Sequence, residues 1–206
     1  MAQLFRIHPR NPQPRLIRQV AEIVRAGGVI VYPTDSLYAL GCALGEKGAM
    51  ERIRRIRRLD DNHNFTLVSR DLSQVSQYAR IENRQYRAIR AVTPGPYTFV
   101  LPATSEVPRR LQHPKRRSVG LRIPGVPIVQ MLLEELGEPL MSTSLILPDV
   151  EHALTDAEEI RERLQHDVDA VVDGDGCGLE PTTVVDWVAS QPRVTRVGAG
   201  DPAPFQ

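Results

Sequence analysis

The sequence has few cysteines and no long apolar run. Its 206 residues include two cysteines, Cys42 and Cys177, and neither belongs to a Cys-x-x-Cys pair. A disulfide framework is therefore not expected, and both thiols are expected to be buried and structural. No apolar stretch approaches the roughly 18 residues that a membrane span requires, and the first residues contain no apolar segment of a secretion signal. The sequence therefore favours a reduced, cytoplasmic protein and predicts no membrane partner.

Several motifs of catalysis and cofactor binding are also absent. The sequence contains no Gly-x-x-x-x-Gly-Lys-Ser/Thr, no Gly-x-Gly-x-x-Gly, no His-Glu-x-x-His and no Gly-x-Ser-x-Gly. These absences argue against a P-loop, a dinucleotide fingerprint, a zinc protease helix and a serine-hydrolase elbow. The five histidines are scattered, without ligand-like spacing to either cysteine. No protein-held metal is expected.

The overall composition is that of an ordinary globular protein. Hydrophobic residues make up 41% of the chain and charged residues 25%. A chain of this length can bury a core without disulfides or metals. We therefore expect residues 1–206 to form a single domain.

Charge is unevenly distributed along the chain, although the net charge is only +1. Residues 105–122 carry six basic residues against one glutamate, whereas residues 149–186 carry twelve acidic residues against two arginines. The loop 109–117 has five basic residues and no acid, and it would bind polyanions in a salt-dependent way. Its candidate RNA- or phosphate-binding residues are Arg109, Arg110, Lys115, Arg116 and Arg117. The alternative is a solvated loop. It lacks aromatic residues, so stacking on single-stranded bases is not predicted.

Hydrophobic periodicity predicts an α/β protein with a mixed sheet. Helices are predicted over 16–24, 49–59, 71–78, 83–92, 128–136 and 156–164. Strands are predicted over 29–32, 65–68, 97–101, 118–123, 140–144, 168–172, 182–187 and 194–197. Several strands follow one another directly near the end, which is not the pattern of a regular doubly wound sheet.

Small polar residues gather at the ends of three predicted strands, in residues 34–38, 142–144 and 182–183. Hydroxyl groups and backbone N–H groups in such positions can bind phosphate or carboxylate oxygens. Turn formation and helix capping are the alternative explanation of each cluster. The arginines of the helix 49–59 could likewise contact a phosphate or RNA, or simply face solvent.

Five segments in a fixed order resemble the YrdC-like family. They are Tyr-Pro-Thr-Asp-Ser-Leu-Tyr-Ala-Leu-Gly (32–41), Pro-Gly-Pro-Tyr-Thr (94–98), Val-Gly-Leu-Arg-Ile-Pro (119–124), Thr-Thr-Val-Val-Asp (182–186) and Arg-Val-Gly (196–198). The runs 63–67 and 142–145 are most similar to the YciO branch. The resemblance implies a YrdC-like twisted mixed parallel/antiparallel sheet with flanking helices and a basic concave cavity.

The resemblance also implies a reaction. Members with the full motif set make threonylcarbamoyl-adenylate from threonine, bicarbonate and ATP, with Mg²⁺ brought by ATP, for modification of an adenosine in tRNA. Several members are described as binding double-stranded RNA or tRNA. By resemblance, the threonine side of the site would be Ser36, Tyr38 and Arg122, the nucleotide side Ser144, Thr182 and Arg196, and the catalytic residue Arg57.

This sequence departs from the family at two motifs. The family's Lys-x-Arg aligns with Arg57 and Leu59, and its Ser-x-Asn aligns with Ser144 and Ile146. Leucine and isoleucine have no side-chain hydrogen-bonding group. In another helix register Arg55 or Arg58 would substitute for the lost arginine. Each lost transition-state contact would cost about 2–4 kcal/mol.

Three functions therefore remain open. The first is a divergent threonylcarbamoyl-adenylate synthase. The second is a non-catalytic accessory protein that binds double-stranded RNA or tRNA. The third is a small-molecule binding module that keeps an adenylate pocket without catalysis.

Overall fold

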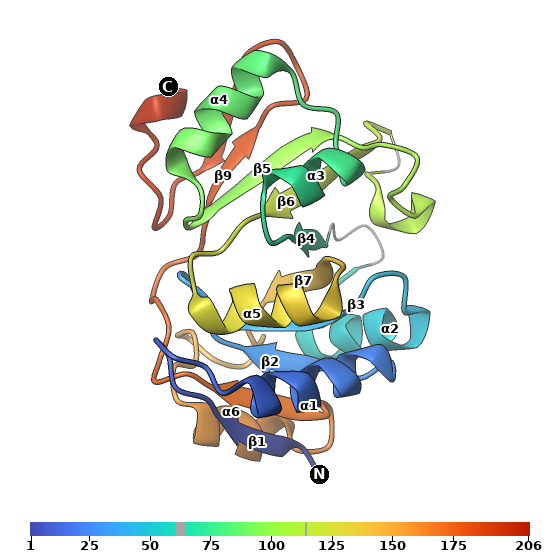
Figure 1. The fold of residues 1–206 in the computed structure, drawn as a ribbon, viewed down its shortest axis with the longest axis vertical. Coiled ribbons are helices and arrows are strands. Elements are labelled where there is room, and N and C mark those ends of the chain that lie inside the picture. The colour runs from blue at the N-terminus through green and yellow to red at the C-terminus, as the bar shows by residue number, and fades with distance from the viewer. Residues whose placement is uncertain (61–64, 114) are drawn as a thin grey trace.

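The computed structural model describes residues 1–60, 65–113 and 115–206, and the side chain of Arg110 also lies outside the description (Figure 1). The strands are β1 (Gln3–Arg6), β2 (Ile30–Tyr32), β3 (Ala39–Ala43), β4 (Thr66–Val68), β5 (Tyr97–Pro102), β6 (Ser118–Arg122), β7 (Leu140–Ser144), β8 (Ala170–Asp173), β9 (Thr183–Asp186) and β10 (Arg193–Arg196). The helices are α1 (Pro14–Arg25), α2 (Lys47–Arg57), α3 (Leu72–Tyr78), α4 (Asn83–Val92), α5 (Pro127–Leu136) and α6 (Ala157–Leu164). Short 3₁₀ turns cover Arg109–Leu111 and Ala203–Phe205.

The strands of the described chain form a single sheet in the order β1-β8-β2-β3-β7-β4-β6-β5-β9-β10. The pairs β1–β8, β2–β8, β4–β6 and β5–β9 are parallel, and the other neighbouring pairs are antiparallel. This arrangement confirms the predicted mixed sheet with flanking helices.

Two apolar clusters form the core on opposite faces of the sheet, because successive residues of a strand point to opposite sides. In β2, Ile30 and Tyr32 pack with α1 and α5, whereas Val31 packs in the cluster that contains α2, α3, α4 and α6. Figure 1 shows α1 in front of β2, α5 in front of β3 and β7, and α3 over β5 and β6, with α4 beside β9. Cys42 is buried in β3 and Cys177 is half-buried, both as free thiols.

The helices begin and end where local chemistry dictates. Pro14 occupies the first turn of α1, where its missing N–H costs nothing, and α1 is followed by the glycine pair 27–28. Gly137 ends α5 in the left-handed conformation, with φ 74°. Asp156 caps α6 by accepting from the Glu159 N–H at 2.7 Å. All the predicted helices and strands that fall in described residues are confirmed.

β1 and β3 were not predicted from the sequence. β3 reads Ala-Leu-Gly-Cys-Ala, which is mostly small residues of low strand propensity. The structure explains the glycine, because a side chain at Gly41 would lie 2.7 Å from the ring of Tyr32. β1 is a short edge strand whose alternating pattern covers only four residues.

Within the residues described, no helix combines the length and the apolar character needed to cross a membrane.

Candidate ligand-binding cavity

A cavity of about 340 Å³ lies along one face of the sheet where β7, β4, β6, β5 and β9 run side by side. Alternate residues of these strands line it, including Thr66, Thr98, Gly120, Ser142 and Val184. The intervening residues, such as those at 67, 99 and 121, are buried in the core on the other face. The period-2 pattern of the strands thus turns a set of small polar side chains toward the cavity.

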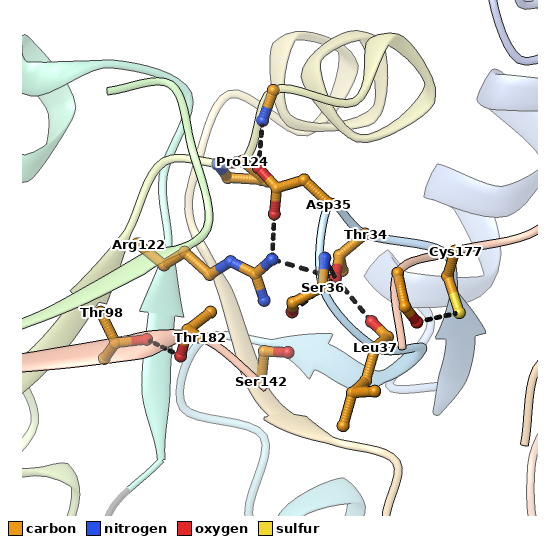
Figure 2. Close-up of polar contacts among 12 residues, drawn as sticks. Thr34, Asp35, Ser36, Leu37, Thr98, Arg122, Pro124, Ser142, Cys177 and Thr182 are labelled. Carbon is orange, nitrogen blue, oxygen red and sulfur yellow. Dashed lines mark hydrogen bonds and ion pairs between the residues drawn. The ribbon is translucent and has the colours of Figure 1, made fainter. Parts of the chain in front are cut away.

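Arg122 and the turn after β2 form one side of the site (Figure 2). Arg122 lines the cavity and is only 6% exposed. Its Nη2 donates hydrogen bonds to Thr34 Oγ1, at 3.0 Å, and to the Asp35 carboxylate, with which it forms an ion pair. The other carboxylate oxygen of Asp35 accepts from the Gly125 N–H at 2.8 Å. The turn is therefore folded around a buried guanidinium, which it holds in one orientation.

Ser36 belongs to this turn, and Tyr38 follows it just before β3. Both are fully buried, and neither is among the described residues that line the cavity. Ser36 hydrogen-bonds Thr34 Oγ1 at 3.1 Å, and the loop 174–180 covers it, because a Cβ on Gly178 would lie 2.4 Å from its carbonyl oxygen. Burial raises the pKa of Tyr38, and Asp173 and Cys177 raise it further. The threonine contact that the family resemblance implies for these two residues stays a prediction.

Arg196 lies at the same end of the cavity as Arg122. Its Nε and Nη2 donate to the carbonyl and hydroxyl oxygens of Thr182, both at 2.9 Å, and Thr182 is hydrogen-bonded to Thr98 at 2.8 Å. Burial lowers the pKa of Arg196, and the charge of Arg122 lowers it further. Two positive charges that interact in this way can together attract an anion.

Arg57 reaches the cavity from the last turn of α2. Its Nη1 donates to Thr143 Oγ1 at 2.8 Å and its Nε to the Ile146 carbonyl oxygen at 3.0 Å. Burial lowers its pKa. Ser144 and Ile146 also line the cavity, so both ends of the altered Ser-x-Asn motif are in the site. Ile146 is 40% exposed there, an apolar surface where the family has an amide.

The lost arginine of the Lys-x-Arg motif is not replaced from the same helix. Leu59 is absent from the described lining of the cavity. Arg58 forms a two-point ion pair with Asp149 at 2.8 and 3.0 Å, outside the cavity. Arg55 is exposed and does not line the cavity either. The substitution by Arg55 or Arg58 that the sequence allows is therefore not seen.

The basic loop divides between the surface and the cavity. Arg109, Lys115 and Arg117 are exposed, and the side chain of Arg110 lies outside the described part of the structure. Arg116 is exposed too, but it also lines the cavity and forms an ion pair of 2.5 Å with Asp186. Among described residues the charged lining is thus four arginines, at 57, 116, 122 and 196, and one aspartate. The predicted basic cavity stays a prediction that this lining supports.

The sequence assigned no function to Ser142, which it placed only in the polar cluster 142–144, or to Tyr32, which hydrogen-bonds Ser142. The Ser142 hydroxyl donates to the Leu40 carbonyl at 2.9 Å, so the Tyr32 hydroxyl donates to Ser142 at 2.7 Å. Burial raises the pKa of Tyr32 to about 12, which keeps that proton in place. Ser142 therefore presents only acceptor capacity to the cavity. The alternation of β7 was the available signal, since Ser142 and Ser144 share a face.

No group of three His, Cys, Asp or Glu side chains within the described residues is placed to hold a metal ion.

A family model named for Sua5, YciO and YrdC, with the description "Telomere recombination", matches residues 22–198. This chain belongs to the Sua5/YciO/YrdC family. It is 56% identical to the uncharacterized protein YciO of Escherichia coli K12, with 100% of both chains covered. The threonylcarbamoyl-AMP synthase of Vibrio vulnificus is 30% identical over 162 residues, which cover 77% of this chain and 86% of that protein.

Solved structures of the Sua5/YciO/YrdC family have the same fold. The crystal structure of E. coli YciO superposes with a TM-score of 0.95 over 100% of both chains, at 56% identity. Sua5 of P. abyssi, solved with L-threonine, has a TM-score of 0.85 at 23% identity, over 95% of this chain and 57% of the Sua5 chain. The predicted recognition of the family and its YciO branch is confirmed, and so is the fold.

Proposed function

We propose that the cavity binds threonine and ATP and forms threonylcarbamoyl-adenylate with bicarbonate, with Mg²⁺ carried by ATP. The observation that carries the proposal is the convergence of Arg122 and Arg196 at one end of the cavity, with Arg57 hydrogen-bonded to Thr143 in its lining. Relatives named threonylcarbamoyl-AMP synthase and a Sua5 structure containing L-threonine support the choice of substrates. We also propose that the protein acts in the cytoplasm, where ATP and tRNA are present.

The reaction needs positioning and positive charge rather than a protein nucleophile. The threonine nitrogen forms a bond to the bicarbonate carbon, and water leaves to give a carbamate. A carbamate oxygen then bonds to the α-phosphorus of ATP as pyrophosphate departs. Negative charge grows on the phosphoryl oxygens, and arginines fixed in advance by other contacts stabilise it without reorganising.

The proposed division of the site follows from its hydrogen bonds. Arg122 is fixed by the turn 34–36 and would bind a carboxylate, while Ser142, which only accepts, suits the amine or hydroxyl of threonine. Arg196 and Thr182 would bind the adenylate phosphate. A cavity of about 340 Å³ falls within the range of small-molecule sites, so ordered binding of both substrates requires close packing.

Mass spectrometry tests this proposal directly. Purified protein is incubated with ATP, Mg²⁺, bicarbonate and threonine, each omitted in turn, and threonylcarbamoyl-adenylate is measured. We expect threonine-dependent product that Arg57→Ala lowers by about 10²-fold or more, the loss typical of one transition-state donor. Arg55→Ala is the matched control, since Arg55 is exposed on the same helix and outside the cavity lining. Equal loss in both variants, or no product from the wild type, contradicts the synthase proposal.

Substrate binding without product would favour the third function, a binding module that has lost catalysis through Leu59 and Ile146. In that case saturable ATP binding still depends on Thr182 and Arg196, and no pyrophosphate is released.

RNA binding is the second candidate, because Arg109, Lys115 and Arg117 are exposed on one loop without an acidic residue among positions 109–117. Binding of tRNA and of double-stranded RNA would be measured at several salt concentrations. If the loop contacts phosphates, Lys115→Ala weakens binding of all sequences alike and lowers the salt slope by about one. An unchanged slope contradicts it.

A further inference from the structure

Arg116 belongs to the basic loop in sequence but to the cavity in structure. Its guanidinium pairs with Asp186 on β9 at 2.5 Å, and both side chains line the cavity. Its backbone N–H donates to His113 Nδ1 at 3.2 Å, and His113 also lines the cavity. The ion pair holds the guanidinium beside the cavity, although the Arg116 side chain is still 40% exposed.

The cavity has arginine at two separate ends. Thr182, which holds Arg196, immediately precedes β9, and Asp186, which holds Arg116, is its last residue. Four residues of a strand span about 13 Å. Arg122 lies at the Thr182 end, near enough to lower the pKa of Arg196. An elongated ligand that fills the cavity along β9 therefore meets guanidinium groups at both of its ends.

Arg116 also differs from the other cavity arginines in the kind of sequence segment that contains it. Arg57, Arg122 and Arg196 fall on segments that resemble family motifs, whereas Arg116 does not. The position where the family has a further arginine holds Leu59, which is not among the described lining residues. Arg116, which comes from the loop before β6, thus brings a positive charge to the cavity, whereas the position after α2 where the family has an arginine holds Leu59.

We propose that Arg116 binds the terminal phosphates of the nucleotide, and that Asp186 holds the guanidinium in place until those phosphates displace it. This inference rests on the proposed function, in which the cavity binds ATP. A terminal phosphate offers more charge and more acceptor oxygens to the planar guanidinium than one carboxylate does. Asp186 keeps a partner after displacement, because its Oδ1 also accepts from the Val188 N–H at 3.3 Å.

Equilibrium binding of ATP, AMP and inorganic triphosphate to the full chain tests the proposal. Arg116→Ala is expected to raise the Kd for ATP and triphosphate about tenfold and to change the Kd for AMP less than about twofold. Arg193→Ala is the matched control: Arg193 is exposed, pairs in register with Asp186 across β9 and β10, and does not line the cavity. It removes the same charge, and we expect less than about a twofold effect on any ligand.

Two further variants separate direct contact from the unpaired aspartate that Arg116→Ala leaves. Asp186→Asn keeps the Val188 contact, and it should tighten ATP binding about fivefold because Arg116 no longer has a competing carboxylate. The double variant should bind ATP more weakly than Asp186→Asn alone. Circular dichroism checks each fold, and Arg116→Lys, which keeps the charge but loses the planar fork, replaces the alanine variant if that one unfolds.

The outcomes are distinguishable from those of the proposed function. Equal effects of Arg116→Ala and Arg193→Ala, or equal losses for AMP and ATP, overturn the role of Arg116. Binding of triphosphate that needs Arg116, with no binding of ATP, overturns the nucleotide function but retains the phosphate site. If the wild type does not bind triphosphate, this inference is overturned whether or not the protein binds AMP.

Discussion

Two ion pairs of this protein join arginine to aspartate in opposite surroundings. Arg122 and Asp35 are 6% and 19% exposed, whereas Arg58 and Asp149 are 67% and 70% exposed. Water and salt screen the second pair, and its median worth is at most about 1 kcal/mol. In the first pair Asp35 neutralises the buried charge of Arg122, so removing Asp35 should lower the free energy of unfolding substantially.

We therefore predict unequal effects of removing each aspartate. Asp35→Ala leaves the buried Arg122 without its carboxylate and should lower the free energy of unfolding by about 3 kcal/mol or more. Asp149→Ala should lower it by less than about 1 kcal/mol. Urea denaturation at pH 7 measures both, and equal losses would show that the turn 34–36 does not depend on the Arg122 charge.

Single residues of the site were predictable only in part. Arg57, Arg122, Ser144, Thr182 and Arg196 follow from the family motifs, and the structure brings them to one cavity. The contact of Arg116 with the cavity was not predictable, because a run of basic residues in a loop has no periodicity that assigns a face. It depends on a partner seventy positions away, Asp186.

Among the elements, α3 depends on its cap most clearly. The helix has only seven residues, and Asp71 accepts from the Gln74 N–H at 2.8 Å. That hydrogen bond, followed by the neighbouring Arg70, holds the pKa of Asp71 below its usual value. Leu72 and Val75 of the same helix are buried in the core over β5 and β6. The cap therefore helps to hold α3 against the face of these strands that is opposite the cavity.

This lowered pKa predicts a pH-dependent loss of stability. Because the folded pKa lies below the unfolded value of about 3.9, the stability that the Asp71 carboxylate contributes is complete well above that value and is lost as pH falls through the folded pKa. Asp71→Ala should cost about 1 kcal/mol at pH 7 and progressively less below about pH 4. Chemical denaturation across this pH range measures the difference. Asp71→Asn keeps an uncharged cap, and its own stability should not depend on titration at position 71; a cost of Asp71→Ala that is constant with pH would contradict the prediction.

Elements with strong periodicity were predictable, and short elements were not. The predicted helix over 83–92 matches α4 to the residue, because its apolar spacing and its capping glutamate agree. β3 was missed because its residues have low strand propensity, and its glycine, Gly41, is required by close packing against Tyr32. Strand order was also beyond the sequence, since pairing partners such as β4 and β7 lie more than seventy residues apart.

On the scale of the whole molecule, the loop 174–180 closes over the turn 34–38 from a distant part of the chain. A Cβ on Gly178 would lie 2.4 Å from the Ser36 carbonyl oxygen and 3.0 Å from its Cα, both backbone atoms that cannot rotate away. The contact joins the acidic segment 149–186 to the turn that holds Arg122.

Gly178→Ala should therefore push these two segments apart. We expect a loss of about 1–3 kcal/mol in the free energy of unfolding, the usual cost of overpacking, and weaker ligand binding at the Arg122 end. Gly48→Ala in α2 is the control, because nothing lies within 4 Å of its added Cβ, and it should be neutral or slightly stabilising. Thermal denaturation compares them; identical melting temperatures would contradict the close contact.

The strand order has a consequence for synthesis on the ribosome. β1 and β2 emerge early, but they never pair with each other, because β8 lies between them and pairs with both. β5 likewise waits for β9, its parallel partner from the end of the chain. Until residues beyond 170 have been translated, several apolar strands keep open edges that can pair with another nascent copy. The last fifth of the chain therefore completes the sheet twice, with β8 between β1 and β2 and with β9 and β10 at the far edge, so open strand edges persist until translation is nearly finished.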